Sequence, residues 1–398
     1  MMRILIIHNK YQLAGGEDAA VAAEVAALAS AGHDIHLELI SNDDIVTAGA
    51  KLKVFMTSPY DSARSEWASH LVDRFRPEVV HVHNFFPKVT PAVHERVAER
   101  GIAVVQTLHN YRLICAGALL LREGIVCEKC VVGSHAWGVI HRCYRGSLAG
   151  SLAVTRMQHR AKRREIWTKS VHRFIALTEF ARQKFVAGGL PAARIEVKPN
   201  LVSQVPQNIL HPSRHGALFV GRLASEKGVD VLMQAWARVP SIHLTILGDG
   251  PERSRLEKSA PRNVTFAGQV NQASVQTYMR SALFLIVPSI CYEGFPMTIV
   301  EAFSVGLPVI ASQIGSLAEI VEDGVNGLHF TPGDSEALAS AARDLENDRA
   351  LLLLLQDGAS NSFQERYLPS KNIRKLEEIY QAAIELAGSS TPSIQPRR

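Results

Sequence analysis

The chain has 398 residues, of which 47% are hydrophobic and 20% charged, with a formal net charge of +5 at pH 7. This composition is typical of a globular protein with two or three domains and argues against a disordered or fibrous chain. No apolar run reaches the roughly 18 residues that a membrane span needs. The apolar run near the N-terminus is shorter than the roughly seven residues of a signal peptide. We therefore expect a cytoplasmic protein.

The first half of the chain alternates short apolar runs with helical patterns. Residues 3–9 (RILIIHN) form a continuous apolar run, which is typical of a strand buried on both faces. A Gly-Gly turn in residues 15–18, a helix over 19–31 and a strand over 34–40 follow. Further strands are expected at 78–84, 101–110 and 171–178. Strands that alternate with helices predict a parallel, doubly wound sheet.

Residues 198–216 contain three prolines and little periodicity, and we interpret them as a linker. The same pattern then restarts, with strands expected at 217–221, 242–248, 264–268, 283–289, 308–312 and 327–330. The predicted fold is α/β, with two doubly wound Rossmann-like domains, 1–200 and 201–370, that face each other across a cleft. A terminal helix over 371–387 is expected to pack back on the first domain.

The stretch EGFPMTIVE, residues 293–301, has a glutamate at each end. Pro296 disfavours a helix that runs through it but is favoured at the first helical position. We expect a helix from Pro296 to about Val305, with Gly306 as its cap. Glu293 then lies in the loop before the helix and Glu301 lies inside it.

Backbone N–H groups near Gly294, Phe295 and Met297, at the start of this helix, would attract an anionic group. Carboxylates repel phosphate but accept hydrogen bonds from vicinal hydroxyls. A diol at each end with a diphosphate between them describes a nucleotide sugar. The competing interpretation is that Glu293 is a solvated loop residue and Glu301 a helix surface charge.

Three more loops favour the nucleotide-sugar interpretation. Arg222 and Lys227 follow the strand at 217–221, where Arg can grip phosphate bidentately and Lys adds a point charge. Gly248 lies in a glycine-bearing loop after the next strand, and Ser316 is expected to cap a helix after another. All of these loops follow strands, so they would meet at one edge of the second sheet.

The segments GRLASEKGVDVLMQAW, ILGDGPE and EGFPMTIVEAFSVGLPVIAS…GSLAEIVEDGVNGLHF resemble the family 4 retaining glycosyltransferases of the GT-B fold. The resemblance is dense over 217–335 and looser in the first domain. It implies that Glu293 holds the donor sugar's hydroxyls and that Glu301 holds the nucleotide ribose. Arg222 and Lys227 would bind the diphosphate of a UDP- or GDP-linked sugar.

The resemblance also implies roles for the remaining candidate residues. Gln269 and Val270 would lie near the base, and Gly15 and Gly16 near the donor phosphates and the acceptor. His109 would lie near the donor sugar, where a histidine can bond a hydroxyl or stabilise developing charge; ordinary loop packing is the alternative. His83 is the next candidate and is interpreted as structural. The complete predicted donor site is Gly15, Gly16, His109, Arg222, Lys227, Gly248, Gln269, Val270, Glu293, Gly294, Phe295, Pro296, Met297, Thr298 and Glu301.

The chain has no Asp-x-Asp motif of the kind that chelates a metal with the donor diphosphate, so no catalytic metal is expected. The resemblance implies retention at the anomeric carbon. The favoured route is a same-face displacement in which the leaving phosphate accepts the acceptor's proton. Cell-surface polysaccharide biosynthesis, of exopolysaccharide or O-antigen, is the expected pathway. A non-catalytic nucleotide-sugar-binding protein and a GT-B sugar-nucleotide epimerase remain the alternatives.

Four cysteines cluster in the first domain: Cys115, Cys127, Cys130 and Cys143. Disulfides are rare in the cytosol, so a structural zinc site and unbridged buried thiols are the two alternatives. The outer two cysteines lack a Cys-x-x-Cys spacing of their own, which weakens the case for zinc.

The basic residues are concentrated in one segment. Residues 142–173 contain nine Lys and Arg and only one acid, Glu165. A basic helix over 154–171, with Arg156, Arg160 and Arg163 on one face, could rest on anionic lipid on the inner membrane face through residues 154–173. A solvated charged face is the alternative, and no nucleic-acid recognition motif accompanies the charge. The expected partners are thus a nucleotide-sugar donor and a saccharide or polyprenyl-diphosphate-linked acceptor.

Overall fold

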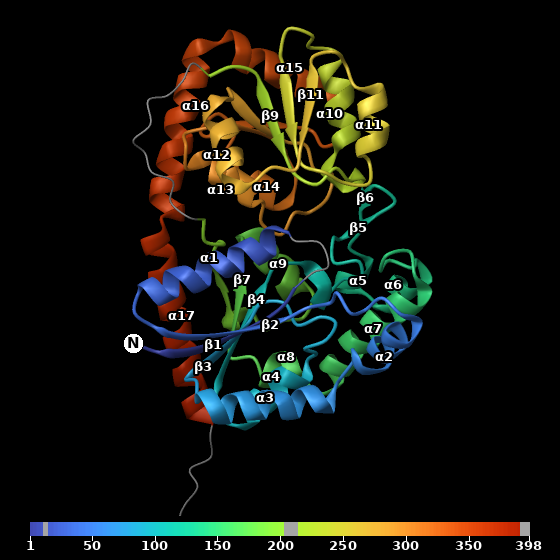
Figure 1. Cartoon of the computed structure of the whole chain (residues 1–398), viewed down its shortest axis with the longest axis vertical. Coiled ribbons are helices and arrows are strands. Elements are labelled where there is room, and N and C mark those ends of the chain that lie inside the picture. Colours follow the sequence, from blue (N-terminus) through green and yellow to red (C-terminus); the bar gives the residue numbers. More distant parts are fainter. Residues whose placement is uncertain (11–14, 203–213, 391–398) are drawn as a thin grey trace, which may run out of the picture. The chain divides into compact units, whose positions relative to one another are not determined.

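The computed structural model describes residues 1–10, 15–202 and 214–390, so most of the predicted linker lies outside the described residues. The chain divides into two compact units. The first comprises Met1–Leu120, Cys127–Leu201 and Ser370–Arg398, and the second Leu121–Val126 and Val202–Pro369. Each unit contains a six-stranded parallel sheet flanked by helices (Figure 1), which confirms the predicted α/β class with two doubly wound sheets.

The first sheet has the strand order β2-β1-β3-β4-β7-β8, and the order reverses between β1 and β3. Its strands are β1 (Arg3–Asn9), β2 (Asp34–Ile40), β3 (Val79–Val82), β4 (Ala103–Leu108), β7 (Arg173–Ala176) and β8 (Ile195–Val197). The central strands β1, β3 and β4 are almost wholly buried, as their continuous apolar runs predict. The three-residue β8 was not predicted.

Helices and one small hairpin complete this part of the chain. They are α1 (Gly16–Ser30), α2 (Ala48–Thr57), α3 (Ser62–Phe75), α4 (Ala92–Glu99), η1 (Tyr111–Leu113), β5 (Leu121–Arg122), β6 (Ile125–Val126), α5 (Lys129–Val132), α6 (Ala136–Ile140), α7 (Leu148–Arg163), α8 (Ile166–Lys169), α9 (Glu179–Ala187), η2 (Ala192–Arg194) and α17 (Pro369–Ser390). The prediction of one helix over 154–171 is wrong. Helix α7 ends at Arg163, and Glu165 adopts a left-handed φ of 55° before α8 begins.

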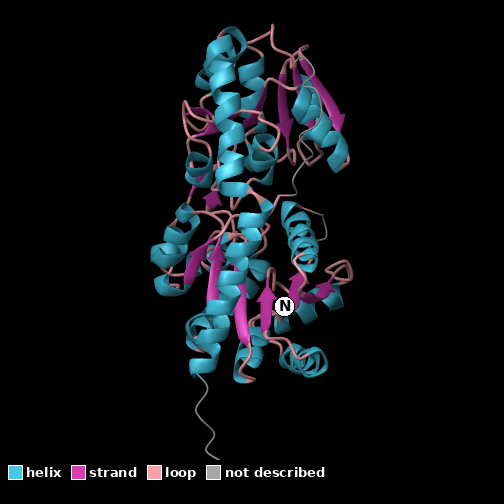
Figure 2. Cartoon of the chain, turned by 90° about the vertical axis from the view of Figure 1, so that its left-hand side faces the viewer, coloured by secondary structure: helices cyan, strands magenta, loops and turns pink. Residues whose placement is uncertain are grey.

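Helix α17 covers the first sheet, as Figure 2 shows in a view onto this helix. Leu376, Ile379 and Tyr380 are buried in one apolar cluster with Ile4 of β1 and Val105 of β4. The helix extends a few residues beyond the predicted 371–387 at both ends. Among the described residues, no helix combines the length and the apolar character that crossing a membrane requires.

The second sheet has the order β11-β10-β9-β12-β13-β14, which is the Rossmann order with its reversal between β9 and β12. Its strands are β9 (Ala217–Val220), β10 (Leu244–Leu247), β11 (Val264–Gly268), β12 (Phe284–Val287), β13 (Val309–Ser312) and β14 (Gly327–Phe330). Its helices are η3 (Ser225–Lys227), α10 (Val229–Trp236), α11 (Arg253–Ser259), α12 (Gln272–Ser281), α13 (Met297–Phe303), α14 (Gly315–Ile320), α15 (Ser335–Asn347), α16 (Arg349–Ser362) and η4 (Phe363–Tyr367).

Two predicted helix starts in this unit are wrong. Helix α13 begins at Met297, because Pro296 has an extended ψ of 94° and serves as the N-cap. Ser316 does not cap α14 but lies fully buried inside it, one residue after Gly315, whose φ is 54°. Gly306 adopts a left-handed φ of 63° in the turn after α13, although Ser304 is the C-cap.

The loop after β10 depends on Gly248. Its φ is 133°, and a Cβ at this position would lie 2.0 Å from the carbonyl oxygen of Gly221. We expect Gly248→Ala to lower the stability of the second unit by about 2–5 kcal/mol, because backbone strain and a backbone clash add. Gly324→Ala is the control, because Gly324 also has positive φ, 72°, but no atom within 4 Å of its Cβ position. Calorimetric unfolding would compare the two variants, and equal losses would contradict the clash.

Candidate active site

The loops after β9 and β12 carry an ion-pair cluster at the point where the strand order reverses. Lys227 Nζ donates to both carboxylate oxygens of Glu293, at 2.6 and 2.9 Å. Ser289, just after β12, donates to Glu293 Oε1 at 2.6 Å. Arg222 forms an ion pair with Glu226, and its side chain is 55% exposed, whereas that of Glu293 is 12% exposed. The predicted cations and the first glutamate are therefore brought together.

The half-buried Lys227 and Glu293 each keep the other charged. Burial alone would raise the pKa of Glu293, but Lys227 and the Ser289 hydroxyl hold that pKa below its usual value. Burial likewise opposes the charge of Lys227, whereas Glu293 raises the pKa of the ammonium. Both groups are charged at neutral pH, and each compensates the other until a ligand arrives.

Glu301 lies in a different environment from Glu293. It belongs to α13, and its Oε1 accepts a hydrogen bond from Gln272 Nε2 of α12 at 2.8 Å. Burial raises the pKa of this carboxyl group, and Gln272 offsets part of the rise. No cation bonds to Glu301 among the described residues. Its hydrogen-bonding capacity therefore suits neutral hydroxyl donors.

The other predicted residues near these two glutamates differ in burial. Phe295, Met297 and Val270 are partly buried and pack against the apolar core of the second unit. Pro296 is buried, whereas Gly294 and Thr298 are half-buried and Gln269 is exposed. Gly248 N–H donates to the carbonyl oxygen of Gly268 at 2.7 Å, which joins the ends of β10 and β11.

In the first unit, Gly15 and Gly16 stand at the start of α1, and both are exposed. Gly15 N–H donates to Asp18 Oδ2 at 3.1 Å, and Asp18 Oδ1 lies 2.8 Å from His8 Nε2. The predicted Gly-Gly turn is therefore partly wrong, because the helix starts at Gly16 and not at Ala19.

His109 follows β4 and is half-buried. Its Nε2 lies 2.9 Å from His83 Nδ1, and both residues line a pocket with Asn84, Gln106 and Arg112. Burial and the neighbouring His83 hold the pKa of His109 well below its usual value, so the ring is neutral at pH 7. His83 is thus a direct partner of the predicted site histidine.

Sequence reasoning missed the residues that orient the predicted ones. Ser289, Glu226 and Gln272 each bond a predicted site residue. Ser289 ends the predicted strand LFLIVPS, so its place at the carboxyl edge of the sheet was a usable signal. Gln272 lies just past Gln269-Val270, but its contact with Glu301 depends on how α12 and α13 pack.

The structure does not support the zinc site. Cys115 and Cys130 are buried, Cys127 and Cys143 are half-buried, and none forms a disulfide. Burial and the three neighbouring thiols raise the pKa of Cys130 to about 11. Within residues 1–10, 15–202 and 214–390, a single set of three or more potential ligand atoms lies within 4.8 Å of one another, and it belongs to Glu24, His81 and His83.

Two parallel doubly wound sheets, with a lysine–glutamate pair at the switch point of the second, define a GT-B class protein. Residues 15–201 match the family described as "Glycosyl transferase 4-like domain", and residues 214–348 match "Glycosyl transferases group 1". The chain therefore belongs to the family 4 glycosyltransferases of the GT-B fold.

Curated relatives match part of the chain. The phosphatidyl-myo-inositol mannosyltransferase of Mycobacterium leprae is 34% identical over 188 residues, which cover 44% of this chain and 50% of that protein. The lipopolysaccharide core biosynthesis glycosyltransferase LpsE of Rhizobium meliloti is 33% identical over 135 residues, which cover 33% of this chain and 39% of that protein. The matched segments span about half or less of these relatives.

A solved structure matches nearly the whole chain. Anabaena Alr3699/HepE, crystallised with UDP and glucose, has a TM-score of 0.67 and 17% identity, and the match covers 96% of this chain and all of that one. At this identity the likeness shows the fold, which is that of two Rossmann-like domains.

We expect Lys227→Met to destabilise the second unit at pH 7 by about 1.5–3 kcal/mol, because it leaves Glu293 charged and poorly compensated. The loss should shrink as the pH falls. In the native protein the depressed pKa of Glu293 contributes stability above its unfolded pKa, near 4.3, that is lost on acidification. In the variant, burial favours the protonated carboxyl.

Thermal unfolding at pH 7 and pH 4 would check this difference. Arg222→Met is the matched control, because its exposed pair with Glu226 should matter little at either pH. A loss that is constant between pH 7 and pH 4 would contradict the assignment to Glu293.

Proposed function

We propose that the protein is a retaining glycosyltransferase that moves a sugar from a nucleotide-diphosphate donor to a saccharide or lipid-linked saccharide acceptor. The Lys227–Glu293 pair at the switch point of the second sheet carries this proposal. Ligands of open α/β sheets bind beyond the strands' carboxyl ends at this reversal. A cation beside a carboxylate suits a ligand that has both a phosphate and hydroxyl groups.

Donor binding would redistribute this ion pair. The diphosphate would attract Lys227 and the exposed Arg222, which would exchange its ion pair with Glu226 for one with the phosphate. Glu293, still held by Ser289, would then accept hydrogen bonds from the sugar's hydroxyls. Glu301 would hold the ribose beside Gln272, and the segment Gln269–Val270 would lie near the base. Gly15 and Gly16 would lie near the donor phosphates and the acceptor, and His109 would lie near the donor sugar.

The reaction would need no metal in this proposal. Lys227 and Arg222 would stabilise the diphosphate as its charge develops, and one such donor is worth about 3 kcal/mol of transition-state stabilisation. The leaving phosphate would take the acceptor hydroxyl's proton on the same face, so the anomeric configuration would be kept. No carboxylate needs to act as a nucleophile in this route, which fits the engagement of Glu293 with Lys227 and Ser289.

Relatives favour a cell-surface polysaccharide as the product. LpsE is named for lipopolysaccharide core biosynthesis, and an exopolysaccharide phosphotransferase of Streptomyces coelicolor is 30% identical over 222 residues, which cover 53% of this chain and 23% of that protein. HepE was crystallised with UDP and glucose, which supports a nucleotide-sugar donor. We infer a role in exopolysaccharide or O-antigen synthesis on the cytoplasmic face of a membrane.

A basic and apolar surface on α2 and α7 supports contact with that membrane. Leu52, Met56, Leu148 and Leu152 are exposed apolar side chains on these two helices, which contact each other. Arg160, also exposed, lies over the ring of Tyr60 at 4.9 Å, and Arg156 lies over Phe55. Such a surface suits an anionic bilayer, although Arg164 is compensated by Glu95.

The donor and acceptor can be tested together. Purified protein, radiolabelled UDP-, GDP- and ADP-sugars and a bacterial lipid extract should give transfer of label from one donor into the organic phase. Arg222→Ala should lower the rate about 10²–10³-fold, because it removes a charge that stabilises the leaving diphosphate. Glu301→Ala should mainly weaken donor binding.

Arg255→Ala, which breaks exposed ion pairs on α11, is the matched control and should leave the rate unchanged. Donor binding without transfer to lipid or soluble saccharide acceptors would favour a non-catalytic binder. Interconversion of the free nucleotide sugar would instead identify an epimerase.

The membrane contact predicts binding to vesicles. Cosedimentation with phosphatidylglycerol-containing vesicles should exceed that with pure phosphatidylcholine and should fall with added salt. Leu52→Ser combined with Met56→Ser should weaken it, because both exposed side chains lose their apolar surface. Leu353→Ser combined with Leu354→Ser on α16 is the control. Equal binding by both double variants would contradict a specific surface.

A further inference from the structure

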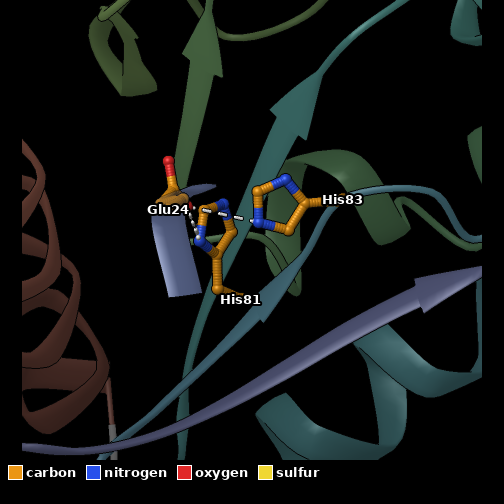
Figure 3. Close-up of side chains that lie close together, drawn as sticks. All are labelled: Glu24, His81 and His83. Atoms are coloured by element: carbon orange, nitrogen blue, oxygen red, sulfur yellow. Dashed lines mark ion pairs between the residues drawn. The ribbon is translucent and has the colours of Figure 1, made fainter. Parts of the chain in front are cut away.

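A buried carboxylate faces two histidine rings in the first unit (Figure 3). Glu24 of α1 has its Oε1 3.3 Å from His81 Nδ1 and 3.3 Å from His83 Nε2, and both histidines belong to β3 or its carboxyl end. All three side chains are buried. His83 continues toward the candidate active site through the 2.9 Å contact of its Nδ1 with His109 Nε2. Glu24, His83 and His109 therefore form a chain of three groups.

Lys198, which bonds the other carboxylate oxygen of Glu24, keeps Glu24 ionised. Lys198 Nζ donates to Glu24 Oε2 at 3.0 Å and to Asn372 Oδ1 at 2.8 Å. Burial would raise the pKa of Glu24, but Lys198 and the two histidines hold it well below its usual value. Glu24 is then an acceptor only. Burial lowers the pKa of His83 to about 3, so this ring is neutral and carries a single N–H.

These charge states fix where the protons lie. Within the described part of the chain, neither Glu24 Oε1 nor His83 Nε2 has a hydrogen-bond partner of good geometry. Glu24 Oε1 lies 3.3 Å from both His83 Nε2 and His81 Nδ1, but His81 Nδ1 has the Tyr380 hydroxyl at 2.8 Å, so Glu24 is the polar group nearest to His83 Nε2. A carboxylate at this distance favours the proton on His83 Nε2. His83 Nδ1 then holds a lone pair and accepts from His109 Nε2–H. His109, also neutral, is left with an unprotonated Nδ1.

We propose that Glu24 and His83 are positioning residues that hold His109 in the Nε2–H tautomer, so that His109 Nδ1 accepts a hydrogen bond from a substrate hydroxyl. The inference rests on the proposed function for the identity of that hydroxyl-bearing ligand, a sugar. The tautomer itself does not depend on turnover. Through His83, the buried carboxylate of Glu24 thus determines which nitrogen of His109 is protonated in the pocket that His109 lines.

A divalent metal held by Glu24, His81 and His83 is the competing interpretation. Their three ligand atoms lie within 4.8 Å of one another, and contacts of 3.3 Å would suit a tetrahedral ion. Two contacts oppose it. His81 Nδ1 already lies 2.8 Å from the Tyr380 hydroxyl, and Lys198 already compensates Glu24. A metal would add two buried positive charges without a counter-charge.

Nitrogen NMR of protein labelled with ¹⁵N-histidine tests the tautomer directly. Comparison with His109→Gln would identify the His109 signals among those of the sixteen histidines. At pH 7 we expect a protonated Nε2 and an unprotonated Nδ1. A proton on Nδ1 in the native protein would overturn the proposal. So would stoichiometric metal in the purified protein that is lost in His83→Gln, because His83 Nε2 would then be a ligand.

Glu24→Gln should reverse the chain. The new amide would direct its carbonyl oxygen to Lys198 and its NH₂ to His83 Nε2. His83 would then carry its proton on Nδ1 and donate to His109 Nε2, so His109 would carry its proton on Nδ1. Tyr380→Phe is the matched control, because it removes a buried hydroxyl from His81 but leaves the contact between His83 and His109. The control should keep the native His109 tautomer. An unchanged tautomer in a folded Glu24→Gln variant would refute the relay, and the native spectrum decides if that variant does not fold.

Kinetics separate positioning from stability. With the donor identified, Glu24→Gln should lower kcat about 10²–10⁴-fold with little change in the donor's KM, because a wrong tautomer removes a correctly placed acceptor. A tautomer that reverses without loss of kcat would overturn the role in catalysis. A protein that transfers no sugar but shows the Nε2–H tautomer would refute the proposed function and leave the relay standing.

Discussion

The buried pair of Glu24 with Lys198 is the interaction on which the first unit depends. It joins the first helix, the residue that follows β8 and, through Asn372, the last helix of the chain. Both side chains are almost fully buried, at 6% and 2% exposure, so neither charge is tolerable without the other. The pair also keeps Glu24 ionised beside His81 and His83. Lys198 therefore links the terminal helix, through Asn372, to Glu24 of the first helix, and it sets the electrostatics behind the pocket of His109.

The second unit also contains a lysine–glutamate ion pair, but this pair is suited to ligand binding. Lys227 and Glu293 also compensate each other, but Lys227 keeps 28% exposure and the pair lies at the open edge of the sheet. A pair that is partly exposed can exchange partners with a charged ligand at modest cost, whereas a fully buried one cannot. The exposure of each ion pair thus indicates its role. The Lys227–Glu293 pair at the sheet edge is suited to ligand binding, whereas the buried Glu24–Lys198 pair stabilises the fold and orients its neighbours.

The sequence predicted the fold class and most strands because strands buried on both faces appear as continuous apolar runs. It failed where tertiary packing decides local geometry. Pro296 became an N-cap and not the first helical residue, and Ser316 was buried inside its helix. In the candidate site, the sequence predicted that Lys227 and Glu293 lie close together, because both residues follow strands of the same parallel sheet. The role of Glu24 was not predicted, because a single glutamate among alanines looks like a surface charge, and its partner is 174 residues away.

The separation of Glu24, Lys198 and Asn372 along the chain has a consequence for biosynthesis. Each step between them spans 174 residues, and the second sheet is encoded between the last two. A ribosome therefore releases the whole second unit before Ile379 and Tyr380 can cover the apolar face that Ile4 and Val105 help to form. While the second unit is synthesised, the nascent first unit exposes that part of its apolar face, and exposed apolar surface of this kind is prone to aggregation.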